Sequence, residues 1–295
     1  PSGCFGPGVV VGCTVPDAVN FNPDATCDGG CVFEAPCPGD IDGDGSVGMS
    51  DLLDLLSAFG LQCEASVESS WSCGDPHSYQ GYDYSTVLIG DQCWFAENLR
   101  SENYENGDAI PSGLNLFEWE NTLSGAVAIY GEGNSNCETN DPDGYACDEA
   151  WSLNEYGRLY NRYAVDDARG LCPSGWHVPT DGEWMTLEMA LGMSESEAND
   201  TGWRGTDQGT QMKTDYGWND GGNGTNSSGF SGLPGGYRYG GGAFSFAGYF
   251  GYWWSSSPNG SFAWYRYLAN DYEGVGRGNS NPQDGFSVRC VRDAE

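Results

Sequence analysis

From residue 84 onward, the apolar residues of this chain stand in short runs separated by Gly, Asn and Pro. These runs suit short strands rather than helices; examples are 85–89, 244–247 and 286–290. One segment differs, since apolar residues recur at helical spacing up to Leu191. Thr180 and Glu183 at its start have the spacing of a capping box. One helix among many short strands predicts an α+β domain and not a doubly wound sheet.

Changes in composition divide the chain into four regions. The first is rich in Gly, Pro, Asp and Cys and has little periodicity, which indicates a small module held together by disulfides. The second combines an acidic loop with a short helix, and the third is rich in Ser, Glu and Gly, as linkers are. The predicted boundaries are 1–36, 37–63, 64–83 as a linker, and 84–295 as the main domain.

The acidic loop carries carboxylates at the first, third, fifth and twelfth positions of a calcium-binding loop. We expect calcium to be bound by Asp40, Asp42, Asp44 and Asp51, with the backbone carbonyl of Ser46 as a further ligand. Gly45 stands where the sharp turn of such a loop requires glycine. Apolar residues then recur at helical spacing until Gly60. An acidic turn without an ion is the alternative, and this close a match makes it the weaker one.

The loop and its helix resemble one half of a dockerin, the calcium module of cellulosome assembly. A dockerin has two such repeats, and residues 64–99 contain no second loop. Asp51 at the last loop position fits the dockerin version. We therefore expect a structural calcium site between Cys37 and Cys63 and not a docking module.

The chain has 43 acidic and 11 basic residues, a net charge of −32, and residues 1–99 contain no Lys or Arg. Such a surface repels phosphate backbones and anionic lipids, so we expect no nucleic acid partner and membrane surfaces are disfavoured. No apolar run approaches the roughly 20 residues that span a bilayer. The same charge attracts divalent cations, although acidic solubility alone would account for most of it.

Twelve cysteines, two histidines and no Cys-x-x-Cys motif favour disulfides over a zinc site. Disulfides imply an oxidising compartment, and the start at Pro1 suggests a processed, exported form at the cell surface or beyond it. We predict the pairs Cys37–Cys63, Cys73–Cys93, Cys137–Cys147 and Cys172–Cys290. The other four cysteines allow three connectivities, of which we favour Cys13–Cys31 with Cys4–Cys27.

An ordered set of short blocks runs through the main domain. It comprises Ile89-Gly-Asp-Gln-Cys-Trp-Phe-Ala-Glu-Asn-Leu99, Tyr156-Gly-Arg-Leu-Tyr160, Leu171-Cys-Pro-Ser-Gly-Trp-His-Val-Pro-Thr180, Glu183-Trp184, Gly229-Phe230, Leu233-Pro-Gly-Gly236, Tyr252-Trp-Trp-Ser-Ser256 and Ser287-Val-Arg-Cys-Val291. This set resembles the Fibrobacter succinogenes major paralogous domain over about residues 84–293.

The resemblance implies a fold related to C-type lectins and to the formylglycine-generating enzyme group, in exported bacterial proteins. The enzymatic relatives use a cysteine pair before the last strand, and residues 229–285 contain no cysteine. Copper-dependent oxidation is therefore not expected.

Nothing else in the sequence points to catalysis. His177 could act as a base, but a structural histidine beside Trp176 is the better interpretation. No pair of acidic residues is singled out by its spacing for glycoside hydrolysis. We expect the protein not to be an enzyme.

Aromatic residues near the end of the chain are candidates for ligand binding, because sugar rings stack on aromatic planes while Asn and Arg bond hydroxyls. The candidate residues are Tyr252, Trp264, Tyr265, Arg266, Tyr267, Asn270 and Tyr272. The same residues could equally form core, and Trp253 or Trp254 is expected there. The loops 134–148 and 219–228 are expected to face solvent, and Asp141, Asp143 and Asp148 give a weak signal for a second calcium ion.

These observations favour a secreted, calcium-stabilised protein that binds a glycan or a surface protein. A structural subunit of an extracellular filament or sheath is the alternative. The apolar segment Val9-Val10-Val11 could then add a strand to the sheet of a neighbouring copy, giving a homopolymer.

Overall fold

The computed structural model describes residues 71–134 and 137–293, together with 11–12, 22–25, 27–28, 49 and 52. The chain divides into two compact units, Pro1–Ser70 and Trp71–Glu295. In the first unit, β1 (Val11–Gly12) pairs in parallel with β2 (Cys27–Asp28). The predicted calcium ligands Asp40, Asp42, Asp44, Ser46 and Asp51 lie outside the described residues, as do one or both cysteines of the pairs Cys4–Cys27, Cys13–Cys31 and Cys37–Cys63.

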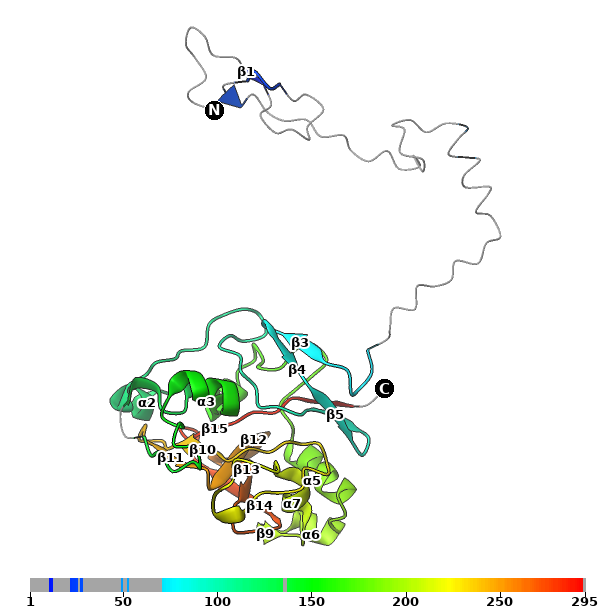
Figure 1. The fold of residues 1–295 in the computed structure, drawn as a ribbon, viewed down its shortest axis with the longest axis vertical. Coiled ribbons are helices and arrows are strands. Elements are labelled where there is room, and N and C mark those ends of the chain that lie inside the picture. Colours follow the sequence, from blue (N-terminus) through cyan, green and yellow to red (C-terminus); the bar gives the residue numbers. More distant parts are fainter. Residues whose placement is uncertain are drawn as a thin grey trace. The chain divides into compact units, whose positions relative to one another are not determined.

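The second unit is built around a large, mostly antiparallel sheet (Figure 1). Its strand order is β7-β8-β15-β10-β12-β13-β14-β9, and β11 pairs with β10. The bounds are β7 Val127–Ile129, β8 Arg158–Asn161, β15 Gly285–Phe286, β10 Gly235–Arg238, β11 Phe244–Ala247, β12 Phe250–Asn259, β13 Phe262–Ala269, β14 Val275–Ser280 and β9 Gly202–Arg204. Some neighbours, such as β8 and β15 or β9 and β14, come from distant parts of the sequence, so this sheet joins the middle of the unit to its end.

Two small sheets lie at the ends of the unit's chain. One has the strand order β16-β6-β5, and the other is the hairpin of β3 and β4. Their bounds are β3 His77–Tyr79, β4 Tyr82–Tyr84, β5 Thr86–Ile89, β6 Gln92–Phe95 and β16 Val291–Asp293. Trp71, Tyr79 and Tyr82 pack against the core, so the folded unit starts at residue 71. The stretch 71–83, expected to be linker, is part of the domain because these aromatic side chains are buried against it.

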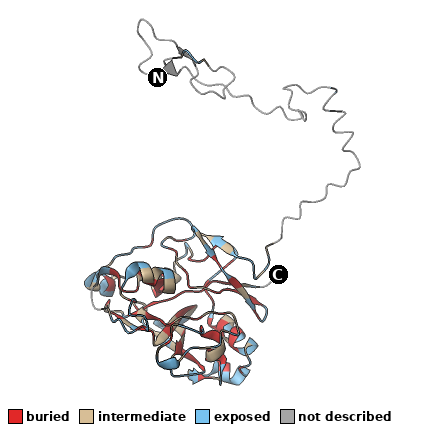
Figure 2. Cartoon of the chain, viewed as in Figure 1, coloured by how far each residue is buried: buried red, intermediate tan, exposed pale blue. Residues whose placement is uncertain are grey.

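Helices lie around the sheet, and most of them have exposed residues on their outer side (Figure 2). Their bounds are α2 Leu116–Asn121, α3 Glu149–Tyr156, α4 Arg162–Val165, α5 Asp181–Ala190, α6 Glu195–Asn199 and α7 Gln208–Met212, with short 3-10 turns at Glu132–Asn134 and Asn219–Gly221. The predicted capping box of Thr180 and Glu183 begins α5. The unit is thus mixed α and β with strands predominating. Among the described residues, no helix is long and apolar enough to cross a bilayer.

Three disulfides fasten the second unit, namely Cys73–Cys93, Cys137–Cys147 and Cys172–Cys290. These three pairs are the ones predicted for this region, so that prediction is confirmed. Cys93 and Cys290 are fully buried. The last bond links residues 118 positions apart, so it holds the middle of the domain to its final strands.

A cluster of buried charges joins α5 to the sheet. Glu188 accepts hydrogen bonds from Arg204 at 2.7 Å and from Arg266 at 2.6 Å. Asp181 is bonded to Arg266 at 2.7 Å and to Arg277 at 2.6 Å. Burial disfavours the ionised form of Asp181, but the hydrogen bonds and charges of Arg277 and Arg266 outweigh it and lower its pKa. Because every carboxylate in this cluster meets two arginines, these charges are compensated where water is excluded.

Removing one member of the cluster is expected to destabilise the fold strongly. In Arg266→Met, Asp181 and Glu188 each lose a partner while remaining buried, and the free energy of unfolding should fall by about 3–5 kcal/mol. All 11 Trp residues lie in the second unit, so urea unfolding followed by tryptophan fluorescence reports on this unit alone.

The control is Arg169→Met, which breaks a surface pair with Asp167 and should change the free energy of unfolding little. Equal losses in the two variants would contradict the importance of the cluster.

Candidate functional site

The seven predicted ligand residues do not share one surface. Side chains alternate along a strand, so Tyr265 and Tyr267 project from one face of β13, and Trp264 and Arg266 project from the other. Tyr252 lies directly opposite Tyr267 on β12 and shares its face. The remaining two, Asn270 and Tyr272, follow in the turn after β13.

The prediction that Arg266 contacts a ligand is wrong. Its side chain is fully buried in the charge cluster under α5. Trp264, on the same face, lies under the guanidinium of Arg277, whose Cζ is 4.1 Å from the ring centroid. Both residues therefore serve the packing of α5 against the sheet. Trp253 and Trp254 are also fully buried, as expected for core.

The opposite face carries four half-buried tyrosines, which we call the tyrosine face: Tyr237, Tyr252, Tyr265 and Tyr267. The ring of Tyr252 lies 5.2 Å from that of Tyr237, 6.0 Å from Tyr265 and 6.1 Å from Tyr267. None of the four hydroxyls has a hydrogen-bond partner among the described residues. This face therefore offers both ring planes and free hydroxyl groups.

The hydroxyls of the tyrosine face remain protonated donors at neutral pH. Burial, together with the nearby Tyr267 and Asp284, raises the pKa of Tyr265 to about 12. Burial likewise raises the pKa of Tyr237, Tyr252 and Tyr267. Each hydroxyl can thus donate one hydrogen bond and accept others.

Two glycines of β14 make room for these rings. Gly276 pairs with Tyr267, and Gly278 pairs with Tyr265. A Cβ atom on Gly276 would lie 2.2 Å from the ring of Tyr267, and one on Gly278 would lie 2.9 Å from the hydroxyl of Tyr265. In the sequence, the alternation Gly276-Arg277-Gly278 is the signal for this arrangement.

The tyrosine face extends into a row of rings across the sheet, which we call the aromatic row: Trp203, Tyr267, Tyr252, Tyr237 and Phe246. Successive ring centroids are 4.4, 6.1, 5.2 and 6.0 Å apart. Trp203 and Tyr267 meet above Gly276, which pairs with both. Trp203 and Phe246, at the two ends, are 37% and 40% exposed.

A hollow of ≈ 400 Å³ lies at the Phe246 end of the row. It is lined by Glu138, Asn140, Asp220, Phe246, Tyr249, Phe250, Asn270 and Asp271. Phe250 stacks on Tyr252 at 5.7 Å, which connects the hollow to the row. Of the seven predicted residues only Asn270 borders it, while Tyr272 packs on Trp203 at the other end.

The backbone is strained at the hollow. Phe246 and Asp220 have φ values of 68° and 54°, in the left-handed region that residues with side chains seldom adopt. Such strain costs about 1–3 kcal/mol per residue and collects at functional sites. At Phe246 this backbone accompanies a ring stacked on Tyr237 with planes 8° apart.

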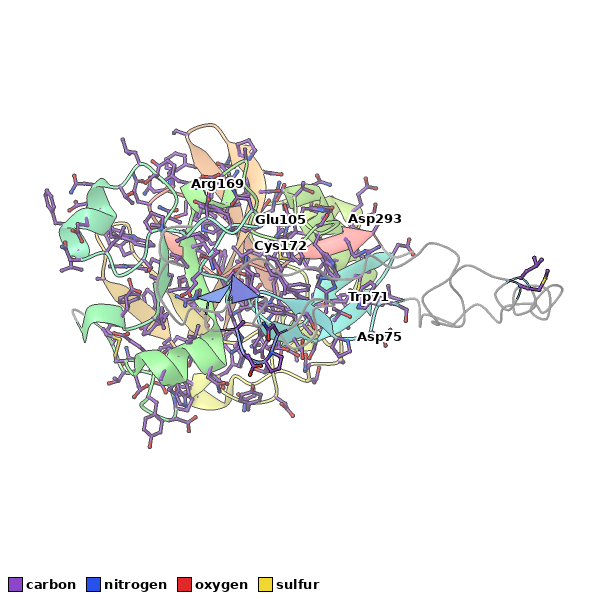
Figure 3. All side chains as sticks on the ribbon, turned by 90° about the horizontal axis from the view of Figure 1, so that it is seen from above. Trp71, Asp75, Glu105, Arg169, Cys172 and Asp293 are labelled. Carbon is purple, nitrogen blue, oxygen red and sulfur yellow. A yellow bond between two sulfur atoms is a disulfide. The ribbon has the colours of Figure 1, made fainter. Side chains whose placement is uncertain are left out.

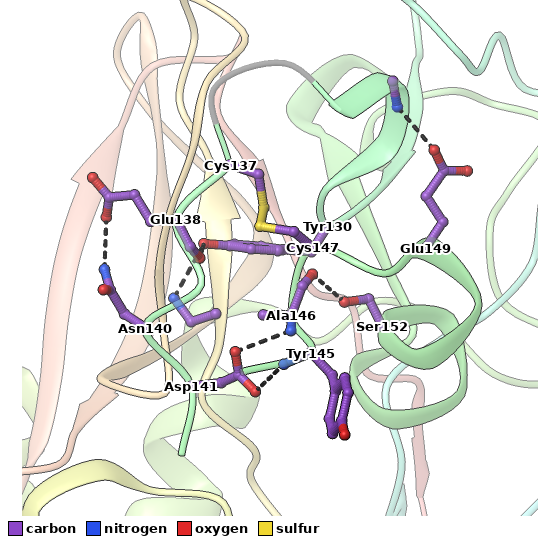
Figure 4. The surroundings of a disulfide bond; sticks show 12 residues. Tyr130, Cys137, Glu138, Asn140, Asp141, Tyr145, Ala146, Cys147, Glu149 and Ser152 are labelled. Carbon is purple, nitrogen blue, oxygen red and sulfur yellow. Dashed lines mark hydrogen bonds between the residues drawn. A yellow bond between two sulfur atoms is a disulfide. The ribbon is translucent and has the colours of Figure 1, made fainter. Parts of the chain in front are cut away.

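The disulfide loop 137–147 forms one wall of the hollow (Figure 4). Asp141 accepts hydrogen bonds from the backbone N–H groups of Tyr145 and Ala146, both at 2.9 Å. Asp148 caps α3 by accepting from Trp151. These carboxylates hold the loop, and no group of three His, Cys, Asp or Glu able to hold a metal occurs among the described residues. This local role explains the acidic spacing that suggested a second calcium ion.

His177 borders a second hollow, of ≈ 360 Å³, together with Glu105 and Cys172, and the last two are labelled in Figure 3. Its Nε2 atom lies 2.6 Å from Glu183, whose other oxygen accepts from Thr180. No Ser or Thr hydroxyl in the described part of the chain bonds to the ring. This arrangement matches a structural histidine that fastens the start of α5.

Comparison with known families gives one match. The model of the Fibrobacter succinogenes major domain matches residues 87–292. No curated protein and no solved structure matches the chain. The matched range contains the aromatic row, the hollow and the charge cluster.

The pair of His177 and Glu183 should make stability depend on pH. The hydrogen bond and charge of Glu183 raise the pKa of His177. Burial opposes ionisation of Glu183, but bonds from His177 and Thr180 prevail and lower its pKa to about 2. The contribution of His177 is therefore complete below its ordinary value and disappears as pH rises through the raised pKa. That of Glu183 is present above its ordinary value and is lost as pH falls toward 2.

In His177→Gln, the loss of unfolding free energy should be largest below the ordinary pKa of histidine, about 6.5, and should decline as pH rises through the raised pKa. Because the pair is half exposed, the maximum should stay below about 1 kcal/mol. Urea titrations across this range measure it. A loss that is independent of pH would contradict an ionic contribution.

Proposed function

The chain belongs to the Fibrobacter succinogenes major domain family, and on this premise we propose that it is a non-catalytic extracellular protein that binds glycans on its tyrosine face. The observation that carries the proposal is the combination of adjacent ring planes with four hydroxyls that have no partner in the described structure. Sugar rings have apolar faces that stack on aromatic planes, and their hydroxyls bond to donors and acceptors at the edge.

A protein partner fits this face less well. The side chains that dominate protein interfaces, Tyr and Trp included, lie in fully desolvated pockets. Here the rings already pack among themselves, and free hydroxyls lie between them, so a ligand rich in hydroxyls complements the face better. The hollow adds amide and carboxylate groups from Asn140, Asn270 and Asp271.

Location outside the cytoplasm is supported by the three disulfides, since such bonds persist in oxidising compartments. Calcium binding is proposed from the loop spacing at Asp40, Asp42, Asp44 and Asp51. The relation of the fold to C-type lectins is part of the same proposal, and it rests on the order of the sequence blocks.

The filament alternative has less support. It relies on the segment ending at Val11 adding a strand to another copy. Val11 and Gly12 already pair with Cys27 and Asp28 of the same chain. A donated strand would have to give up this pairing.

Glycan binding should depend on single hydroxyls of the tyrosine face. Tyr265→Phe keeps the ring and removes one donor, so binding on a glycan array should weaken about three- to tenfold, the value of one hydrogen bond. Tyr265→Ala should weaken it further. The control is Tyr145→Phe, which removes an exposed hydroxyl outside the row. An array without any signal for the unmodified protein, with and without calcium, would refute the proposal.

Native mass spectrometry after dialysis against calcium should find one ion bound per chain. Asp42→Ala removes a ligand, and the bound ion should be lost. Asp215→Asn removes an exposed carboxylate of the second unit and should leave binding unchanged. Calcium retained in Asp42→Ala would show that the loop is not the site.

A further inference from the structure

We propose that the ligand is a neutral, extended polysaccharide that lies across the strands along the aromatic row, with one of its sugar residues held in the hollow beside Phe246. This inference rests on the proposed glycan binding. It adds the charge of the ligand, its shape and its direction on the sheet.

The charge of the ligand follows from where the basic residues lie. Of the 11 basic residues, eight are buried in the domain. They are Arg158, Arg162, Arg204, Lys213, Arg238, Arg266, Arg277 and Arg289. The hollow is lined by three carboxylates, on Glu138, Asp220 and Asp271, and by no basic side chain. Uronic acids and sulfated sugars would meet only negative charge there, which disfavours an anionic sugar and agrees with a neutral one.

The shape of the ligand follows from the sheet. Trp203, Tyr267 and Tyr252 are linked through direct cross-strand pairs on β9, β14, β13 and β12. Tyr237 on β10 and Phe246 on β11 continue this line. Six strands at the usual separation of about 4.8 Å span roughly 24 Å. A row of this length, with neighbouring rings in contact, matches several sugar residues of a straight chain and exceeds a single monosaccharide.

The two ends of the row differ, which gives the bound chain a direction. At one end, Trp203 and Tyr272 offer exposed rings in contact with each other. At the other end, Phe246 and Phe250 adjoin Asn140 and Asn270 in the hollow. The polar groups can bond the hydroxyls of one enclosed residue, and the open row can only stack. Every chain should therefore use the hollow, and only longer chains should reach Trp203.

This arrangement can be tested by calorimetric titration of the full chain with neutral β-linked gluco-oligosaccharides, from disaccharide to octasaccharide. Affinity should rise with chain length and then level off. Phe246→Gly should weaken binding of every length about tenfold, the value of one aromatic contact. Glycine also relieves the strained backbone at this position, so folding should be retained.

Trp203→Ala should leave short oligosaccharides unaffected and weaken long ones about tenfold. Gly276→Ala should have the same effect on binding as Trp203→Ala. Its Cβ atom would lie 2.2 Å from the ring of Tyr267 and would displace that ring. Phe117→Ala is the matched control, since this ring on α2 is 73% exposed and lies outside the row. It should bind as the unmodified protein does.

The outcomes separate the two proposals. Three results would overturn the neutral-chain inference and leave glycan binding in place. They are an affinity that is independent of chain length, an equal effect of Trp203→Ala on short and long chains, and tighter binding of polygalacturonate than of neutral chains. No binding of any saccharide would overturn both. Affinity that rises with length, with Trp203→Ala affecting only the longer chains, supports the inference.

Discussion

Two carboxylates and three arginines, buried between α5 and the large sheet, determine which face of that sheet the helix covers. Asp181 begins α5, and Glu188 lies two turns further on the same helix. Their partners project from β9, β13 and β14. Leaving one of these charges unpaired costs several kcal/mol, so α5 cannot shift by a turn without breaking pairs. Because Arg266 is held inward, its neighbours Tyr265 and Tyr267 must point to the opposite face. The tyrosine face is thus a consequence of the charge cluster.

The sequence predicts those features that depend on few residues. The helix at Thr180 follows from a local capping pattern, and three cysteine pairs of the domain agree with their order along the chain. The prediction of Arg266 as a ligand residue is wrong, because the direction of its side chain depends on which face of β13 a helix covers. The sequence predicts only part of the aromatic row. Trp203, Tyr237 and Phe246 join Tyr252 in the row through a strand order that departs from the sequence order.

The basic residues act mainly as hydrogen-bond donors for loops. Lys213 donates to the carbonyls of Ala269 and Tyr272. Arg289 donates to the carbonyls of Phe95, Phe230 and Ser231, and burial lowers its pKa to about 9. A domain with long connections between short strands has many carbonyl groups that no strand satisfies. Using arginines for this purpose leaves the acidic residues to form the surface, which gives it a negative potential.

The two ends of the described domain lie on the same side, where Trp71 and Asp293 are labelled in Figure 3. Cys73 is bonded to Cys93, and Cys93 is paired with Arg292 between β6 and β16. A pulling force applied at residues 73 and 293 would therefore pass through one covalent bond and one short ladder. The large sheet and its row of rings lie outside this path. Tension between these two points would therefore leave the arrangement of the rings unchanged.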